Sequence, residues 1–329
     1  MIENPANQKK AKLMLLTAMI LFGTLGLFIR YIGEIPSSVI ALIRAAVGCL
    51  FLLVFIRVRK IPLSRTALKA NLKLLTVSGA FLGFNWIFLF EAFKHTSIAV
   101  AVICYYMAPV IVILASPFTL GERLTPRKVC GVFGALLGMI CISGIYRTGF
   151  SAAADISGIF FGLLVACFYA AVILCNQKIK SVASYDRTII QLFIACLALL
   201  PYTVLTEYGT PICITPFSLA ILLFIGIVHT GITYVLFFSS MKDLPAQSVA
   251  IFTYLDPIVA VLLSVLFLGE SLTPVGALGA FLVLGSTFSA NKNKTAVTYP
   301  MLNVTPYLLY PSKKTCRQAC LFTGSRRRS

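Results

Sequence analysis

Two seven-residue stretches with one shared pattern decide the fold. Leu120–Pro126 reads L-G-E-R-L-T-P, and Leu268–Pro274 reads L-G-E-S-L-T-P. The offset between them is 268 − 120 = 148 positions, and the same offset pairs Pro109 with Pro257. Two unrelated apolar helices can share leucine and isoleucine by chance, but they rarely share an ungapped motif of this kind. The sequence therefore contains an internal repeat.

The composition excludes several classes of protein. The chain has 329 residues, of which 59% are hydrophobic and only 12% are charged, whereas soluble domains average about 25% charged. Its net charge of +18 would suggest nucleic-acid binding, but so apolar a chain has no polar basic face to offer. Disorder and a disulfide-rich secreted domain are excluded by the same apolar excess and by the scattered cysteines. The composition predicts a polytopic membrane protein without a nucleic-acid partner.

Ten stretches are long and apolar enough to cross a membrane, which takes about 20 residues each. Helices are expected because lipid offers no hydrogen-bond partner to an unpaired backbone. The fold class predicted is therefore all-α integral membrane. The predicted spans are 13–31, 37–56, 72–90, 98–120, 129–145, 156–175, 188–206, 217–238, 246–268 and 275–290.

The repeat divides these spans into two halves of five, at residues 13–146 and 155–290. Because five is odd, the second half must enter the membrane upside down relative to the first. Inverted repeats are typical of secondary transporters, whose substrate site lies near the membrane midplane between the halves. We therefore expect two inverted five-helix repeats around a central cavity. Residues 1–12 and the basic tail 291–329 are predicted to be cytoplasmic, and the tail to be disordered.

Lysine and arginine concentrate in the loops on one side of the predicted spans. These are the loops on the same side as the N-terminus, and Arg187 is counted among their charges. The positive-inside rule then predicts a plasma-membrane protein with both termini in the cytoplasm. The same basic loops can contact anionic lipid.

On this motif and span pattern, the sequence resembles the EamA-type transporters of the drug/metabolite transporter superfamily. The resemblance covers about residues 11–290 and includes a proline followed by L-G-E-x-L-T-P in both halves. It also includes an arginine, Arg44, in the second span. The resemblance implies ten helices around a central cavity and transport of small metabolites, often amino acids or related compounds.

Arg44 and Asp256 are the charges that stand inside predicted spans. An arginine within the membrane costs about 2.5–3.5 kcal/mol on insertion scales, so it should face a partner or a cavity. Arg44 could pair structurally with a carboxylate or carbonyls, or it could recognise a substrate carboxylate or phosphate. Asp256 could form a fixed ion pair, or it could bind a proton or a substrate amine. Both alternatives stay open for each residue, and proton coupling with them.

Polar and aromatic residues occupy matched midspan positions in the two halves. They fit the lining of a substrate cavity, although core packing explains any single one equally well. For the histidine among them, a helix–helix hydrogen bond is the stronger alternative to a proton relay. These predicted substrate-binding residues are Asn85, Trp86, Tyr105, Tyr106, His229, Tyr234 and Tyr254.

The repeated motif and the midspan prolines are predicted to shape turns or gates. Glycine ends a helix, threonine caps the next one, and proline takes its first position. The glutamate could bond amides at a helix end or bridge to the other half, as part of a tight hairpin or of a gate. These residues are Pro109, Gly121, Glu122, Pro126, Pro257, Gly269, Glu270 and Pro274.

The function predicted is secondary active transport of a small polar metabolite, such as an amino acid or related zwitterion or anion, by alternating access. The alternatives are a facilitative channel and a nucleotide- or cofactor-type metabolite exchanger of the same fold. An enzyme is not predicted, because no clustered catalytic residues stand at one interface. No Walker lysine motif, metal-ligand spacing or cofactor motif occurs. The oligomeric state stays open.

Overall fold

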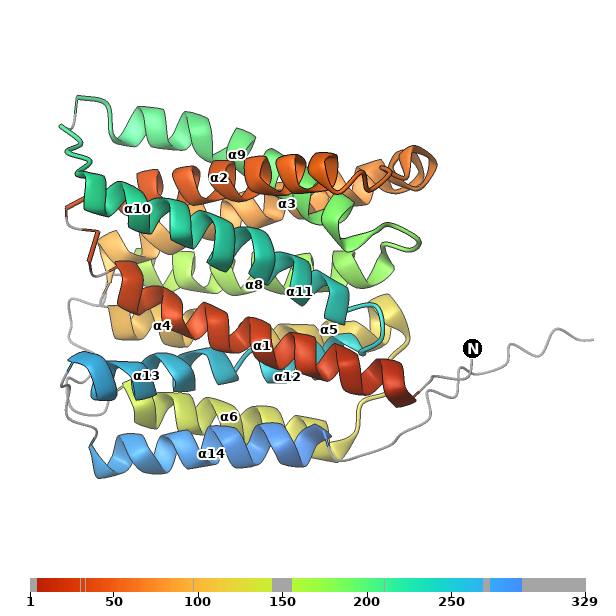
Figure 1. Cartoon of the computed structure of the whole chain (residues 1–329). Helices are drawn as coiled ribbons and strands as arrows, with labels where there is room; N and C mark the ends of the chain where they lie inside the picture. The colour runs from red at the N-terminus through yellow and green to blue at the C-terminus, as the bar shows by residue number, and fades with distance from the viewer. Residues whose placement is uncertain are drawn as a thin grey trace, which may run out of the picture. The chain divides into compact units, whose positions relative to one another are not determined.

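Helices form the described part of the chain, and they lie side by side with their loops at two ends (Figure 1). The computed structural model describes residues 5–29, 31–32, 34–96, 98–143, 156–209, 211–268 and 273–291. All of these belong to one unit, residues 1–294. The elements are α1 (Pro5–Ile29), α2 (Ser37–Val58), α3 (Arg65–His95), α4 (Ile98–Tyr105), α5 (Ala108–Leu120), α6 (Pro126–Ser143), α8 (Ile156–Lys178), α9 (Ser184–Thr206), α10 (Pro216–Phe224), the π-helix η1 (Ile225–Ile232), α11 (Thr233–Ser240), α12 (Ala246–Phe252), α13 (Leu255–Leu268) and α14 (Pro274–Asn291).

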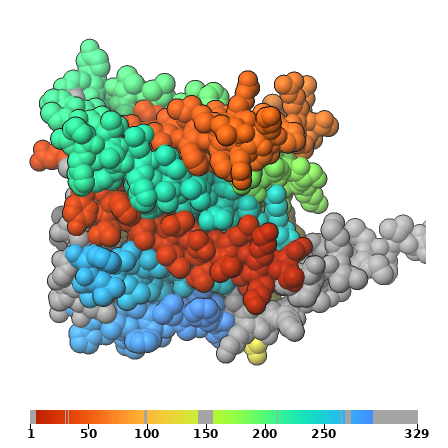
Figure 2. Space-filling view, viewed as in Figure 1, coloured from red at the N-terminus to blue at the C-terminus, as the bar shows by residue number. Residues whose placement is uncertain are grey.

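The predicted all-helical membrane fold is confirmed. Within the described residues, eight helical segments are long and apolar enough to cross a membrane, and a shorter apolar helix covers Pro274–Ala290. With α6, these segments fit the ten-helix, two-repeat architecture. Large apolar side chains such as Phe118, Leu266 and Phe281 are exposed, as expected where lipid replaces water. Figure 2 shows one such outer face, on which α1 lies beside α13 and α11.

Two helices extend beyond the apolar stretches that predicted them. α1 begins at Pro5 and the third membrane helix, α3, runs from Arg65 to His95, whereas the predicted spans were 13–31 and 72–90. The additional turns carry lysine and arginine, which water and headgroups solvate beyond the hydrocarbon core. Hydropathy therefore marks the part of a helix inside the membrane, and not the ends of the helix itself.

The helix packing keeps its pattern when the two halves are exchanged. α3 packs against α8 as α1 packs against α11, and α3 packs against α9 as α2 packs against η1. The first helix of each half also packs on the broken fourth helix of the other half, α1 on α13 and α8 on α5. A repeated sequence folded twice gives this exchange symmetry directly.

Small residues let the paired helices approach closely. A Cβ atom placed on Gly48 of α2 would lie 2.9 Å from the carbonyl oxygen of Gly226 in η1. A Cβ on Gly138 of α6 would lie 2.6 Å from the carbonyl oxygen of Gly279 in α14. Close backbone contact of this kind is the usual way in which membrane helices gain packing energy, since lipid tails provide no hydrophobic drive between them.

Two of the membrane helices are broken at the same relative place. The fourth ends as α4 at Tyr105 and resumes as α5, and the ninth ends as α12 at Phe252 and resumes as α13. Pro109 and Pro257 lie in the first turn after each break. Proline removes a backbone donor and clashes with the preceding turn, so an uninterrupted helix is disfavoured there.

The π-helix η1 has no counterpart in the prediction. It occupies the middle of the eighth membrane helix, between α10 and α11, and packs against α2. The Thr233 hydroxyl donates to the carbonyl of Val228, five residues earlier, at 2.8 Å. Such wide turns are rare and occur often at functional sites. Hydrophobic periodicity does not reveal one turn of different pitch inside a continuous apolar run.

Candidate functional site

Arg44 of α2 lies over an aromatic ring inside the helix bundle. Its guanidinium carbon is 4.4 Å from the centroid of the Trp86 ring, which α3 provides. Arg44 is half-buried, and its Nε is buried without a hydrogen-bond partner among the described residues. The indole face stabilises the cation and fixes the plane of the guanidinium. The site therefore holds a positioned cation that still has a donor to offer.

Aromatic side chains from both halves continue from this pair. The Tyr234 ring of α11 is 6.1 Å from that of Trp86, measured between centroids. The Tyr105 ring of α4 lies 5.1 Å from the Tyr106 ring and 5.4 Å from the Tyr169 ring of α8, again between centroids. The structure thus brings four of the predicted lining residues into one aromatic cluster with Arg44.

Asp256 lies in the first turn of α13 and is half-buried. It is close enough to Tyr105 and Tyr234 to act on both electrostatically, and Arg44 acts on the same two tyrosines. Within the described residues, no ion pair joins Arg44 to Asp256. Among the described residues, Arg44 and Asp256 are therefore both near these two tyrosines without being paired directly with each other.

One hydrogen bond connects the two helix breaks. The Tyr254 hydroxyl donates to the backbone carbonyl of Tyr106 at 3.0 Å, and the bond is buried. The two rings lie 6.1 Å apart. Tyr106 and Tyr254 are equivalent positions of the repeat, yet the bond uses the side chain of one and the backbone of the other. It links α4 and α5 to α12 and α13 beside Asp256.

Two predicted lining residues hold helices together instead of joining the cluster. The Asn85 side-chain amide donates to the Val165 carbonyl of α8 at 2.9 Å and is buried. His229 Nε2 is 2.7 Å from the Thr24 hydroxyl of α1. The histidine ring also packs against Phe28, with 5.2 Å between centroids. These contacts match the helix–helix alternative for His229.

Glu122 joins the first half to the second at one end of the bundle. Gly121 ends α5 with a positive φ of 70°, which turns the chain toward α12. The Glu122 carboxylate accepts from the backbone amides of Ala246, at 2.6 Å, and Gln247, at 3.2 Å. Gln247 in turn donates to the Ser116 hydroxyl at 2.6 Å. Burial raises the pKa of Glu122, although the two amides oppose that shift. Both roles considered for this residue, amide capping and bridging, therefore occur in one contact.

The prolines of the repeated motif begin helices. Pro126 is the first residue of α6 and Pro274 the first of α14. The Thr273 hydroxyl accepts from the Gly276 amide at 3.0 Å, as an N-cap does. Gly269 and Glu270, also predicted as gate residues, lie outside the described residues.

Two residues lie elsewhere than the sequence predicts or were not predicted at all. Arg187 was placed in a charged loop, but it is buried and donates to the carbonyls of Asn176, at 3.2 Å, and Ile179, at 3.0 Å. It therefore satisfies the end of α8, and no sequence signal distinguishes this role from a loop charge. Tyr169 was not among the predicted lining residues, although it is an aromatic residue inside the predicted span 156–175.

A groove lies elsewhere, between α6 and α14. It has a volume of about 550 Å³, and neither Arg44 nor Asp256 lines it. A smaller groove of about 270 Å³ lies at the ends of α2, α3 and α9, where Ser38 donates to Glu207 at 2.6 Å. The charged aromatic cluster, in contrast, is enclosed by the helices.

Comparison with known proteins identifies relatives over most of the chain. Residues 9–144 and 156–291 each match the EamA-like transporter family. The uncharacterized transporter YxxF of Bacillus subtilis (strain 168) is 29% identical over 306 residues, which cover 91% of this chain and 97% of the relative. The aromatic amino acid exporter YddG of Ancylobacter novellus is 24% identical over 273 residues, covering 83% and 93%. One solved crystal structure has a TM-score of 0.76 at 21% identity, covers 85% of this chain and 97% of its own, and so shows the same fold.

We expect Tyr254→Phe to destabilise the protein by about 0.6 kcal/mol, the average for hydrogen bonds between membrane helices, and by at most about 1.7 kcal/mol. The substitution keeps the ring but removes the donor to the Tyr106 carbonyl. The midpoint of thermal unfolding in detergent measures the effect. Tyr106→Phe is the matched control, because it leaves the Tyr106 carbonyl in place and should unfold as the parent does. Equal midpoints for Tyr254→Phe and the parent would contradict the role of this bond.

Proposed function

Because the chain belongs to the EamA-like transporter family, we propose that it moves an amino acid or a related zwitterion across the plasma membrane by alternating access. The chain is a multi-pass membrane transporter and not an enzyme, and its family implies a small-molecule substrate. The observation that carries the finer proposal is Arg44, which is positioned by Trp86 and whose buried Nε–H has no acceptor among the residues that the structure describes.

The two separated charges match the two ends of a zwitterion. The Arg44 guanidinium offers forked donors to a substrate carboxylate, and such charge-assisted pairs are the strong ones. Asp256 offers acceptor oxygens to a substrate amine. Since both charges act on Tyr105 and Tyr234, a bound zwitterion would lie along the tyrosines between them. An uncharged substrate would leave both of these costly membrane charges without use.

The aromatic lining favours a substrate with an apolar or aromatic side chain. Trp86, Tyr105, Tyr169 and Tyr234 present ring faces and edges near the two charges. Aromatic rings prefer offset or edge-to-face neighbours and add packing energy beyond burial. The relative from Ancylobacter novellus that is named an aromatic amino acid exporter is consistent with this choice.

Counterflow into proteoliposomes tests the proposed function. Proteoliposomes that are preloaded with unlabelled amino acid should transiently accumulate labelled amino acid from outside. The initial rate should saturate with the external concentration, whereas a channel gives no such accumulation. Aromatic and aliphatic amino acids, organic acids and nucleotides form the substrate panel. Saturable counterflow of nucleotides alone would support the exchanger alternative, and flux without counterflow would support a channel.

We expect Arg44→Gln to lower the rate of counterflow at least tenfold, because the neutral amide cannot replace a forked cation at a carboxylate. Arg44→Lys should retain part of the activity, since it keeps the charge but loses the planar contact with Trp86. Arg59→Gln is the matched control, since Arg59 lies over the Phe55 ring at the end of α2, with 6.0 Å from its guanidinium carbon to the ring centroid. Full transport by Arg44→Gln would contradict carboxylate recognition.

We expect Asp256→Asn to lower transport and to remove the dependence of transport on pH, because the carboxylate can carry either a proton or the substrate amine. Initial rates measured across a pH series, with Asp243→Asn as the control in an exposed loop, give the comparison. If Asp256→Asn keeps the pH dependence of the parent, proton coupling does not run through this residue.

We place both termini in the cytoplasm, which puts Glu122 at the inner end of the bundle and makes its contact with α12 an inner gate. We expect Glu122→Ala to open this end, because Ala246 and Gln247 lose their shared acceptor. The reporter is Tyr105→Cys in a background without other cysteines. With Glu122→Ala, this cysteine should react several-fold faster with a thiol reagent added from the cytoplasmic side than it does with Glu122 present. Glu34→Ala, at an exposed position, is the control. An unchanged labelling rate would make Glu122 a structural cap and nothing more.

A further inference from the structure

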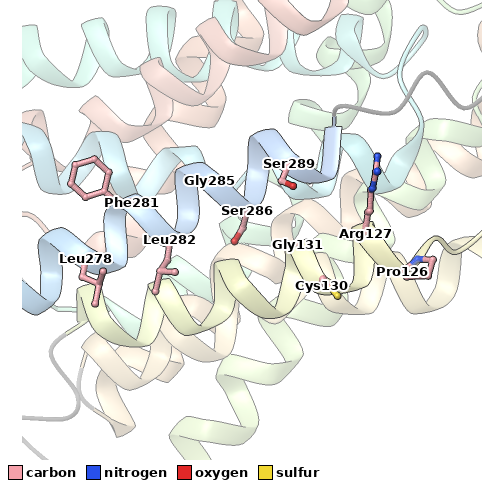
Figure 3. Close-up of a pocket in the computed structure, with 10 residues that line it drawn as sticks. All are labelled: Pro126, Arg127, Cys130, Gly131, Leu278, Phe281, Leu282, Gly285, Ser286 and Ser289. Atoms are coloured by element: carbon pink, nitrogen blue, oxygen red, sulfur yellow. The ribbon is translucent and has the colours of Figure 1, made fainter.

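The groove between α6 and α14 has two chemically different ends. Its volume is about 550 Å³, within the range of about 300–1,000 Å³ for sites that hold one small ligand. Figure 3 shows the two helices antiparallel along it. Arg127, Ser286 and Ser289 lie toward one end, and Leu278, Phe281 and Leu282 toward the other. A ligand that fills the groove must therefore be polar at one end and apolar along the rest.

The hollow exists because glycines replace side chains on its walls. A Cβ atom on Gly285 would meet no atom within 4 Å, so that position opens into free space. Nearby, Gly138 and Gly279 bring the two backbones into contact, and a Cβ on Gly131 would lie 2.6 Å from the Cβ of Ala290. The helices thus touch along one line and leave an opening on the outer face beside it. Gly131 and Gly285 both line that opening.

The polar end lies where a lipid headgroup would be. Arg127 follows Pro126 in the first turn of α6, at the end of the membrane span, and its side chain extends toward the C-terminal end of α14 (Figure 3). A guanidinium binds phosphate through paired hydrogen bonds, and its five N–H groups can serve several acceptors. With the termini in the cytoplasm, this end faces the cytoplasmic leaflet, which contains anionic lipids. Basic pockets between membrane helices on that side bind the headgroups of such lipids.

We propose that this groove binds one anionic phospholipid, with its phosphate at Arg127 and an acyl chain along Leu278, Phe281 and Leu282. The serine hydroxyls lie between these two parts of the groove and can donate to ester oxygens of the glycerol region. A transported amino acid is too short and too polar to cover the apolar wall. The groove therefore serves a structural lipid and is separate from the Arg44 cluster.

Native mass spectrometry of the full-length protein tests this binding after extraction from vesicles that hold equal amounts of phosphatidylglycerol and phosphatidylcholine. The parent should retain one phosphatidylglycerol in several-fold preference. Gly285→Leu fills the hollow without a clash and should abolish retention. Gly26→Leu is the matched control, because a Cβ there also meets no atom within 4 Å, on α1. Arg127→Gln should keep a lipid but lose the preference for phosphatidylglycerol. Arg123→Gln, four residues earlier in the exposed loop before α6, should keep both the lipid and the preference.

Three results would overturn the proposal. Equal retention by Gly285→Leu and the parent would mean that the retained lipid lies outside the groove. No preference in the parent would mean that the groove is covered only by exchanging bulk lipid. A dimer that Gly285→Leu converts to a monomer, with no lipid retained by the parent, would mean that a second copy of the chain fills it. Arg127→Gln keeps the test decisive if Gly285→Leu does not fold, because the headgroup preference is measured independently. None of these readouts depends on transport.

Discussion

The hydrogen bond from the Tyr254 hydroxyl to the Tyr106 carbonyl is the contact on which the site depends. A broken helix leaves backbone groups without their usual partners, and the membrane interior supplies no water to satisfy them. The two breaks must therefore lie against each other or against side chains that donate. Their mutual contact satisfies the Tyr106 carbonyl in this way, and Asp256 of α13 lies near Tyr105 of α4 beside it.

The framework is symmetric, but the chemistry is not. The repeat offset places Leu192 opposite Arg44 and Ala108 opposite Asp256, so each charge occurs in one half only. A duplicated fold supplies two related sets of helix contacts, and their exchange gives a natural path between two packings. Under the proposed function, the unequal charges would give the substrate site one orientation although the two halves share one fold. The helix geometry is asymmetric as well. The π-helix η1, which Gly48 contacts, has as its counterpart in the first half a stretch of regular α-helix within α3.

The sequence predicted the fold well because its strongest signals are local or repeated. Apolar runs marked the helices, and the L-G-E-x-L-T-P motif marked equivalent turns. What the sequence could not show is which distant residues meet. His229 is hydrogen-bonded to Thr24 of α1, and Arg187 donates to two carbonyls at the end of α8. These contacts arise from helix packing, which residue spacing along the chain does not predict. Arg44 and Trp86 were both predicted as site residues from the sequence, but only the structure shows that they are in contact.

The strength of the Glu122 contact suits a gate better than a permanent fastening. Hydrogen bonds to a charged group are worth about 1.5–3 kcal/mol each, less when the carboxylate must be desolvated. Burial opposes the charge on Glu122, so its two bonds to α12 hold the end of the bundle by a modest net margin. A margin of about 1.4–2.8 kcal/mol corresponds to a 10- to 100-fold bias between two conformations. A substrate that binds the two conformations with a similar difference in affinity can reverse that bias. Under the proposed alternating-access function, such a contact would be strong enough to keep one end closed and weak enough for substrate binding at Arg44 to release it.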